Sequence, residues 1–507
     1  MLVVSACADE VAEGEGAKNM EGVWSFGLAV LIVALAGMAA LGSNWVSERA
    51  RIPAPAFFLV GTAVAVDVFP QLRKLSMATV QDVVTIALVV LLFQGGMDIG
   101  WRRFKPEARA ILSIGVLGTF ATAGLLAVAA HLLLGLDWRI ALLLGTALAP
   151  TDPAVVFSVL GRRKITGRTG VLLPGESGAN DPVGIALMAG LLGTSAGSAL
   201  GTAGHTALLF VQEMAIGAVL GAAGGWGLKF LMRKVPLPAE GLYPLRTLAG
   251  AFAVYGLTTV AHGSGFLAVF VAGVLLGDVR APYKKEIERF HTALGSLGEI
   301  VAFAVLGLTV PLWTFTREGA WTDGLLLAVL LAFVVRPVVM AALLWRMRLS
   351  IGERVFLAFT GLKGAVPVLL GSYLVSSGVP DADRLYDVVF VVVVFSVIVQ
   401  GSLVPTVARL CKVPMRSVEL EPWALGVRLK DRPEGVVRHV VEEGSAADGS
   451  RVDGLDIGED TWISMVVREG GIIPVSGSTQ LRVGDEVLLI TGDGDEECAG
   501  PFTAGRE

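Results

Sequence analysis

The stretch Gly175-Glu176-Ser177-Gly178-Ala179-Asn180-Asp181-Pro182 places two carboxylates inside an otherwise apolar segment that runs from residue 171 to residue 192. Such a segment is long enough to cross a bilayer, whose hydrocarbon core of about 30 Å needs about 20 apolar residues in a helix. A carboxylate at that depth costs at least about 2.5–3.5 kcal/mol to insert, so an acidic residue there indicates a functional site. The stretch therefore predicts a buried polar site in a membrane helix.

Helical spacing sorts the polar side chains of this stretch onto shared faces. Ser177 and Asp181 are four residues apart, and so are Glu176 and Asn180. Residues at this spacing are neighbours on the surface of a helix. We expect one of these faces to hold an ion.

The composition of the whole chain indicates a polytopic membrane protein. Of its 507 residues, 54% are hydrophobic and only 17% are charged, and the mean hydropathy is +0.70. These values lie outside the range of soluble domains. The three cysteines show no metal-ligand or disulfide spacing, which excludes cysteine chemistry from this interpretation. Apolar stretches of membrane length predict about thirteen spans, which begin near Trp24, Ala54, Thr79, Arg109, Arg139, Gly167, His205, Leu245, Gly265, Glu288, Thr322, Glu353 and Leu385.

The loops between these spans alternate between rich and poor in basic residues. Because basic loops stay on the cytoplasmic side, thirteen spans predict an external N-terminus and a cytoplasmic C-terminus. Residues 1–23 are acidic and are interpreted as an extracytoplasmic leader. No basic segment and no adequate apolar segment precedes the lipobox-like Cys7, so we expect no lipoprotein signal, and Met1 and Met20 both remain candidate start sites.

Two spans are interrupted by helix breakers next to a charge. The fifth span contains Ala-Pro-Thr-Asp-Pro-Ala at residues 149–154, and the twelfth contains Thr-Gly-Leu-Lys-Gly-Ala-Val-Pro at residues 360–367. Proline removes a backbone donor and disfavours helix in the residue before it, so both spans are expected to unwind. We expect Asp152 to lie near the N-terminal dipole of a half-helix and Lys363 near a C-terminal one.

The positions of the two breaks predict an inverted repeat. If the spans divide as six, one linker helix and six, each broken span is the fifth of its half, and the halves enter the membrane from opposite sides. Paired broken helices of this kind are typical of the midplane site of secondary transporters. Kinks in packed helices are the alternative explanation. We predict an all-α polytopic membrane bundle with inverted repeats and two discontinuous, crossed helices.

Several motifs in this order resemble a known family, the bacterial monovalent cation:proton antiporters. The chain is most similar to the potassium/proton, NhaP-like branch with a cytoplasmic regulatory tail. The resemblance covers residues 24–410 and the tail. It implies a homodimeric transporter in the bacterial cytoplasmic (inner) membrane, with K+ or Na+ and H+ as substrates and no cofactor. The motifs are Thr151-Asp152-Pro153, Glu176-Ser177-Gly178, Asn180-Asp181-Pro182, Arg336-Pro337 and Gly361-Leu362-Lys363-Gly364-Ala365-Val366-Pro367.

The resemblance also implies roles for individual residues. Asp181 is the expected catalytic group, which binds either a proton or the cation. Asp152, Thr151 and Ser177 are the expected further oxygen ligands, so the monovalent cation would lie at Asp181 and Asp152. Oxygen ligands suit hard cations. If the Asp181 carboxylate binds a proton whenever it releases the cation, the movement of one ion is coupled to the opposite movement of the other, which is antiport.

Other positions are expected to support this site. Asn180 matches members that exchange one cation for one proton, and Glu176 and Arg336 match a structural ion pair. The sequence departs from the family at two positions. Gln94 stands where many members have an acidic ligand, and Lys363 stands where many have arginine, whose planar guanidinium a lysine does not reproduce.

After residue 410, charged residues and glycine replace the apolar runs, and a small soluble α+β domain is expected. Residues 411–433 read as a linker, and the domain itself covers 434–507. It resembles the C-terminal half of regulator-of-potassium-conductance (TrkA-C-like) domains, which implies a sensor of a cyclic dinucleotide or nucleotide. A dimerisation module without a ligand remains the alternative, and no nucleic-acid partner is expected. Short strands are predicted at 436–441, 462–467, 471–475 and 486–491.

Two other functions remain open alternatives. Ser177 with His262 resembles the nucleophile and base of an intramembrane serine protease, but this leaves Asp152, Asp181 and the paired breaks unexplained. A passive cation channel would use the same oxygens without proton coupling, and paired short breaks favour alternating access instead.

Overall fold

The computed structural model describes residues 53–69, 75–161, 163–193, 199–310, 312, 319–417, 436–457, 461–468, 471–491 and 501–502, together with Met38 and Gly42. The chain divides into two compact units, Met1–Leu420 and Glu421–Glu507. The predicted leader, the predicted span at Trp24 and most of the predicted linker lie outside the described residues.

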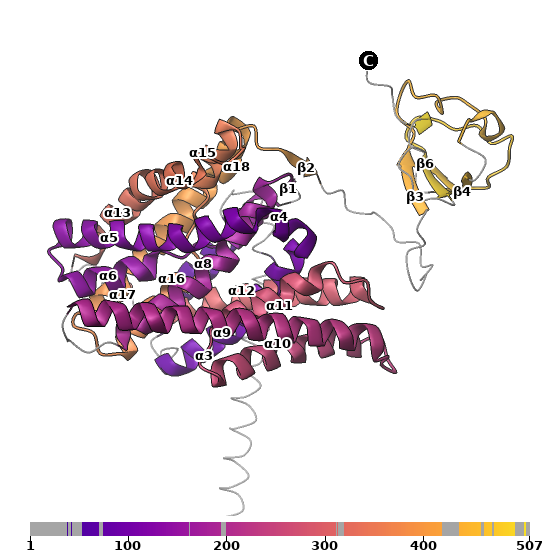
Figure 1. Cartoon of the computed structure of the whole chain (residues 1–507). Coiled ribbons are helices and arrows are strands. Elements are labelled where there is room, and N and C mark those ends of the chain that lie inside the picture. The colour runs from indigo at the N-terminus through magenta and orange to yellow at the C-terminus, as the bar shows by residue number, and fades with distance from the viewer. Residues whose placement is uncertain are drawn as a thin grey trace, which may run out of the picture. The chain divides into compact units, whose positions relative to one another are not determined.

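The first unit is a helical bundle (Figure 1). Three of its long helices contain a π-helical segment, namely α4–η2–α5, α13–η4–α14 and α17–η5–α18. The elements are α2 (Ala54–Val68), α3 (Met77–Ile99), α4 (Trp101–Leu112), η2 (Ser113–Leu117), α5 (Gly118–Leu134), α6 (Trp138–Leu148), α7 (Ala154–Leu160), α8 (Thr169–Leu192), α9 (Ala199–Lys234), α10 (Leu242–Val260), α11 (Gly265–Gly277), α12 (Lys284–Gly307), α13 (Ala320–Leu330), η4 (Leu331–Val335), α14 (Arg336–Leu344), α15 (Ile351–Phe359), α16 (Ala365–Ser376), α17 (Ala382–Phe395), η5 (Ser396–Gln400) and α18 (Gly401–Leu410).

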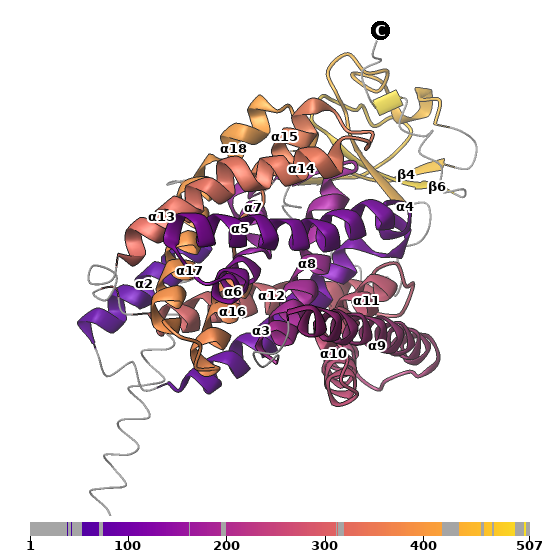
Figure 2. The same ribbon diagram turned by 60° about the vertical axis from the view of Figure 1, so that its left-hand side comes forward.

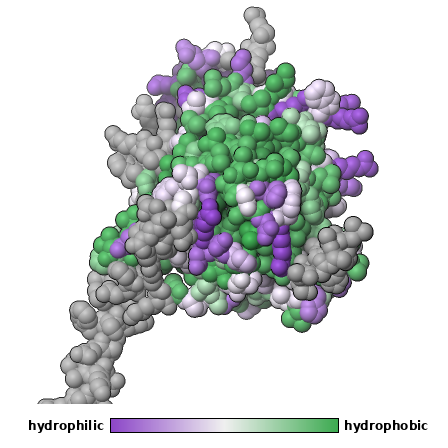
Figure 3. Space-filling view, turned by 90° about the vertical axis from the view of Figure 1, so that its left-hand side faces the viewer, coloured by the Kyte–Doolittle hydropathy of each residue, from purple (hydrophilic) through white to green (hydrophobic). Residues whose placement is uncertain are grey.

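Every predicted span from Ala54 onward falls on one of these helices or on a broken pair of them. Among the described residues, six helices are long and apolar enough to cross a membrane, and four shorter apolar helices accompany them. The chain is thus mostly helical, and the total of thirteen spans stays a prediction. Figure 3 shows one face of the molecule with a broad apolar area across its middle. Large apolar side chains exposed on α5 and α13, such as Leu132 and Leu326, suit contact with lipid.

Both predicted breaks are present. Helix α6 ends at Leu148 and α7 begins at Ala154, while α15 ends at Phe359 and α16 begins at Ala365. The intervening non-helical segments meet, because the Asp152 amide donates to the Leu362 carbonyl at 2.8 Å. Between them, α8 runs through the interior of the bundle (Figure 2), and most of its residues are buried. The fold therefore brings the two unwound segments and the polar stretch of α8 together.

A two-stranded ribbon within the first unit pairs the segment after α7 with the start of the predicted linker. Strand β1 (Arg163–Ile165) follows α7, and strand β2 (Met415–Ser417) follows α18. The strands pair antiparallel, with Lys164 opposite Arg416. The chain that leaves the helical bundle is thus hydrogen-bonded to the segment between α7 and α8.

The second unit contains a four-stranded antiparallel sheet in the order β3-β6-β4-β5. Its strands are β3 (Val436–Val440), β4 (Thr461–Arg468), β5 (Gly471–Ile473) and β6 (Glu486–Thr491), which confirms the four predicted strands. Buried apolar side chains such as Val466, Leu489 and Phe502 form its core. The described residues of this unit contain one short 3₁₀ segment and no α-helix, so the helical part of the predicted α+β class is not seen there.

We expect Asp485→Asn to destabilise the second unit by about 2 kcal/mol at pH 7. The Asp485 carboxylate is 1% exposed and accepts from Arg468 Nε and Nη2 at 2.8 and 2.7 Å. Burial raises the pKa of Asp485, but the Arg468 guanidinium and the Arg482 amide outweigh it and hold the pKa below its ordinary value. Urea unfolding of residues 421–507, followed by circular dichroism, measures the loss.

The pH dependence of this stabilisation has a definite sign. Because the pKa is lower in the folded state, the stabilisation is complete above the unfolded-state pKa and is lost as pH falls through the folded-state pKa. The gap between wild type and Asp485→Asn should therefore shrink in acid. Asp453→Asn is the matched control, since its pair with Arg451 is solvent-exposed and contributes little. A gap that is absent at pH 7 would contradict the prediction.

Candidate functional site

Lys363, in the second break, is hydrogen-bonded to the backbone of the first break. Its Nζ donates to the Ala149 and Pro150 carbonyls, both at 2.9 Å, and the side chain is buried. These carbonyls follow the C-terminal end of α6, where helical carbonyls lack partners and carry partial negative charge. The Lys363 amide donates to Ser396 Oγ at 2.9 Å. The expected place of Lys363 at a C-terminal end is thus confirmed.

Asp152 lies in the break between α6 and α7, on the side of α7. Its Oδ1 accepts from the Ala154 amide at 2.8 Å, where α7 begins. The acid therefore meets the N-terminal end of the half-helix, as predicted from the helix dipole. Asp152 also lines a cavity of about 690 Å³.

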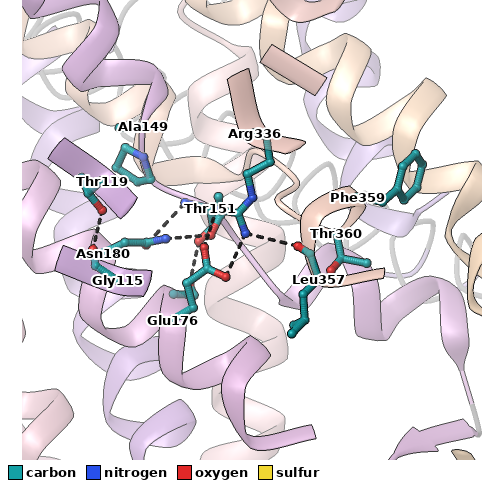
Figure 4. Close-up of polar contacts among 12 residues, drawn as sticks. Gly115, Thr119, Ala149, Thr151, Glu176, Asn180, Arg336, Leu357, Phe359 and Thr360 are labelled. Carbon is teal, nitrogen blue, oxygen red and sulfur yellow. Dashed lines mark hydrogen bonds and ion pairs between the residues drawn. The ribbon is translucent and has the colours of Figure 1, made fainter. Parts of the chain in front are cut away.

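Thr151 connects the break to α8. The Asn180 Nδ2 donates to Thr151 Oγ1 at 2.7 Å, and the Ser177 hydroxyl donates to the Thr151 carbonyl at 2.6 Å. Figure 4 shows Asn180 and Thr151 facing each other. Both side chains are buried. Three of the predicted site residues are therefore joined in one hydrogen-bonded group.

Glu176 and Arg336 form the expected ion pair. Arg336 Nη1 lies 2.5 Å from Glu176 Oε1, and Nη2 lies 2.8 Å from Oε2 (Figure 4). The side chains are 2% and 4% exposed. Arg336 Nη2 also reaches the Leu357 carbonyl at 3.4 Å. The pair thus joins α8 to α14 and α15, and a side chain at Gly361 would collide with the guanidinium.

Asp181 differs from these groups because part of its carboxylate is unpaired. Its side chain is 6% exposed, and its Oδ1 has no hydrogen-bond partner within the described part of the chain. It lines the cavity together with Asp152 and Ser177. A buried carboxylate oxygen without a partner is costly, so the position suits a group that takes up a proton or a cation.

Two further residues line the cavity, one neutral and one acidic. Gln94 of α3 lines it, and its Nε2 lies 3.4 Å from Asp98 Oδ2. Glu299 of α12 lines it as well and was not predicted. The sequence did contain a signal for Glu299, because an acidic residue between Gly298 and Ile300 lies inside a predicted membrane span.

The protease arrangement is absent from the described structure. Ser177 donates to a backbone carbonyl inside the bundle. His262 is exposed in the turn between α10 and α11, with a φ of 57°. A nucleophile and its base must lie within hydrogen-bond reach of each other, and no such bond joins these two residues.

Comparisons with known proteins agree on one family. The family described as "Sodium/hydrogen exchanger, transmembrane" matches residues 5–410. The K(+)/H(+) antiporter NhaP of Alkalimonas amylolytica is 32% identical over 420 residues, which cover 80% of this chain and 71% of that protein. The K(+)/H(+) antiporter NhaP2 of Shewanella oneidensis is 32% identical over 419 residues, covering 82% and 72%.

A solved structure shows the same fold. The sodium proton antiporter MjNhaP1 of Methanocaldococcus jannaschii, at pH 8, superposes with a TM-score of 0.63 at 21% identity. The match covers 75% of this chain and 98% of that one.

Proposed function

Because this chain belongs to the sodium/hydrogen exchanger family, and is therefore a cation:proton antiporter rather than an enzyme, we propose that Asp181 binds the proton and the cation alternately. Support comes from its buried, unpaired Oδ1 on the wall of the cavity. One carboxylate cannot hold both ligands, since each neutralises the same negative charge. Family membership supports antiport over the protease and channel alternatives.

The other predicted ligands complete the site in this proposal. Asp152 contributes its carboxylate from the break, and Thr151 and Ser177 contribute neutral oxygens. Unwound backbone at membrane depth is suited to binding ions. Movement of the helices that carry these groups would expose the cation to each side of the membrane in turn.

The exchange is proposed to be electroneutral. Asn180 is held by Thr151 and its amide carries no charge, so a single titrating carboxylate, Asp181, would exchange one proton for one monovalent cation. A membrane-potential dye in the transport assay tests this point, because electroneutral exchange leaves the potential unchanged.

We propose potassium as the preferred cation, on the basis of the two relatives named K(+)/H(+) antiporters. The test uses proteoliposomes that contain a pH dye, to which potassium or sodium chloride is added at a series of concentrations. Proton movement driven at lower potassium than sodium concentration is expected. The reverse order would overturn the ion assignment without affecting antiport, and cation uptake without proton movement would overturn antiport.

The assembly and its orientation are also proposals. We propose a homodimer in the bacterial inner membrane, with the N-terminus outside and the C-terminus in the cytoplasm. The alternation of basic loops supports the orientation. Cysteine accessibility in intact cells tests the orientation, and cross-linking in native membranes tests the dimer.

We further propose that the second unit regulates transport through the β1–β2 ribbon, in response to a cyclic dinucleotide or nucleotide. Lys164 in β1 lines the cavity and lies opposite Arg416 in β2. The Thr166 amide also donates to the Pro414 carbonyl at 2.9 Å. A displacement of the linker would therefore be transmitted through the ribbon to Lys164 in the wall of the cavity.

Two truncations test this regulation. Removal of residues 421–507 leaves β2 in place, whereas removal of residues 415–507 also removes β2. Both are expected to abolish the response to added nucleotides, and only the longer deletion is expected to change the basal rate of exchange. Equal basal rates in the two truncations would show that the ribbon has no role, and an unchanged response in both would overturn regulation by this unit.

A further inference from the structure

One face of α12 borders the cavity. Thr292, Ser296, Glu299 and Phe303 all line it, and their spacing of three or four residues places them on a shared side of the helix. Glu299 lies fifteen residues after Lys284, which corresponds to roughly 22 Å along the helix. Glu299 therefore borders the cavity from well inside a membrane-length helix.

One oxygen of the Glu299 carboxylate is not engaged by the described residues around it. Its Oε1 is buried and has no hydrogen-bond partner in the portion of the chain that is described. Ser296, a polar residue on the same face, donates to the Thr292 carbonyl of its own helix at 3.1 Å. A buried carboxylate that serves only structure is normally paired, as Glu176 is. The Oε1 atom of Glu299 therefore lacks the contact that a structural role would give it.

The two buried basic side chains of the described bundle, Lys363 and Arg336, are committed elsewhere. Lys363 binds two backbone carbonyls, and Arg336 pairs with Glu176. Lys284, at the start of α12, lies 3.4 Å from Glu288. Arg103 and Lys164 also line the cavity, but in the described residues no ion pair joins either of them to Glu299, so its Oε1 remains open to a cation in the cavity.

Glu299 lines the same cavity as the proposed site but belongs to a different helix. Asp152 and Asp181 reach the cavity from the break and from α8, whereas Glu299 reaches it from α12. Among the residues that the structure describes, no three acidic, histidine or cysteine side chains lie close enough to hold one metal ion together. Glu299 therefore does not form a three-ligand metal cluster with Asp152 and Asp181 in this conformation. Gln94, which also lines the cavity, is neutral and packs against Gly295 of α12.

We propose that Glu299 is a second cation-binding carboxylate, which holds the incoming monovalent cation in the cavity before it moves to Asp181. The proposal rests on the proposed role of Asp181. A carboxylate on a low-dielectric wall concentrates cations and so increases the apparent affinity. At several ångströms in a partly aqueous cavity, its attraction corresponds to roughly a tenfold change in affinity.

The test compares half-saturating cation concentrations in proteoliposomes at fixed pH. Glu299→Gln is expected to raise this concentration for potassium and sodium about tenfold, while the maximal rate stays close to that of wild type. Glu286→Gln is the matched control, because Glu286 is exposed on the same helix and does not line the cavity. Glu299→Asp keeps the charge one methylene further back and is expected to fall between wild type and Glu299→Gln.

Each outcome supports or overturns the proposal. An unchanged half-saturating concentration in Glu299→Gln, or a loss of maximal rate alone, would overturn it. If Glu299→Gln does not fold, Glu299→Asp decides, since a value equal to that of wild type would overturn the proposal. Asp181→Asn measured in parallel separates the two roles, because exchange that survives in that variant contradicts the role of Asp181, whatever Glu299 does.

Discussion

Replacing Asp181 by asparagine is expected to abolish cation:proton exchange entirely. The substitution keeps the size of the side chain but removes the only charge that the proposed cycle titrates, and an amide neither binds a proton near neutral pH nor neutralises a cation. Asp181 is 6% exposed, and its Oδ1 makes no hydrogen bond with the described residues, so few structural contacts are lost. The variant should fold and insert normally, yet give the pH trace of empty liposomes when potassium or sodium is added.

A matched control separates this effect from general damage. Asp137 precedes α6 in an exposed position and its side chain makes no cap hydrogen bond, so Asp137→Asn should exchange at the wild-type rate. Both variants should elute from size exclusion as wild type does. Cation-driven proton movement that persists in Asp181→Asn would show that another group carries the exchanged charge.

Local sequence signals account for the features that were predicted correctly. The breaks at 149–153 and 360–364 follow from proline and glycine, whose effects on the backbone act over one or two residues. The strands of the second unit follow from alternating β-branched residues bounded by turns. The link between Glu176 and Arg336, 160 residues apart, came from family resemblance, because no local rule joins distant charges.

The features that were missed depend on how distant segments meet. Glu299 is one acid in an amphipathic helix, and only the packing of α12 against α3 near the break turns it toward the cavity. The ribbon between β1 and β2 joins segments about 250 residues apart through backbone groups, which leave no pattern in the side chains. His291 is fully buried and hydrogen-bonded to Thr247 of α10 at 2.9 Å, a contact that no local pattern indicates.

Neutralising one member of the Glu176–Arg336 pair is expected to cost about 3–5 kcal/mol, the largest loss of stability predicted for this chain. In Arg336→Gln the Glu176 carboxylate would remain 2% exposed without its partner, and α8 would lose its tie to α14. Because α8 also carries Ser177 and Asp181, the fraction of folded, exchanging protein should fall together with the unfolding temperature. Thermal unfolding of the purified protein, followed by circular dichroism, measures this loss.

The double variant Glu176→Gln/Arg336→Gln distinguishes a lost contact from an uncompensated charge. If the cost of each single variant comes from leaving the other charge buried and alone, removing both charges should restore much of the stability, and the double variant should be more stable than either single one. Arg384→Gln is the control, because its pair with Asp323 is partly exposed and should contribute about 1 kcal/mol or less. Costs that simply add in the double variant would mean that the two side chains act independently, and that the fixed position of α8 depends on its apolar packing instead.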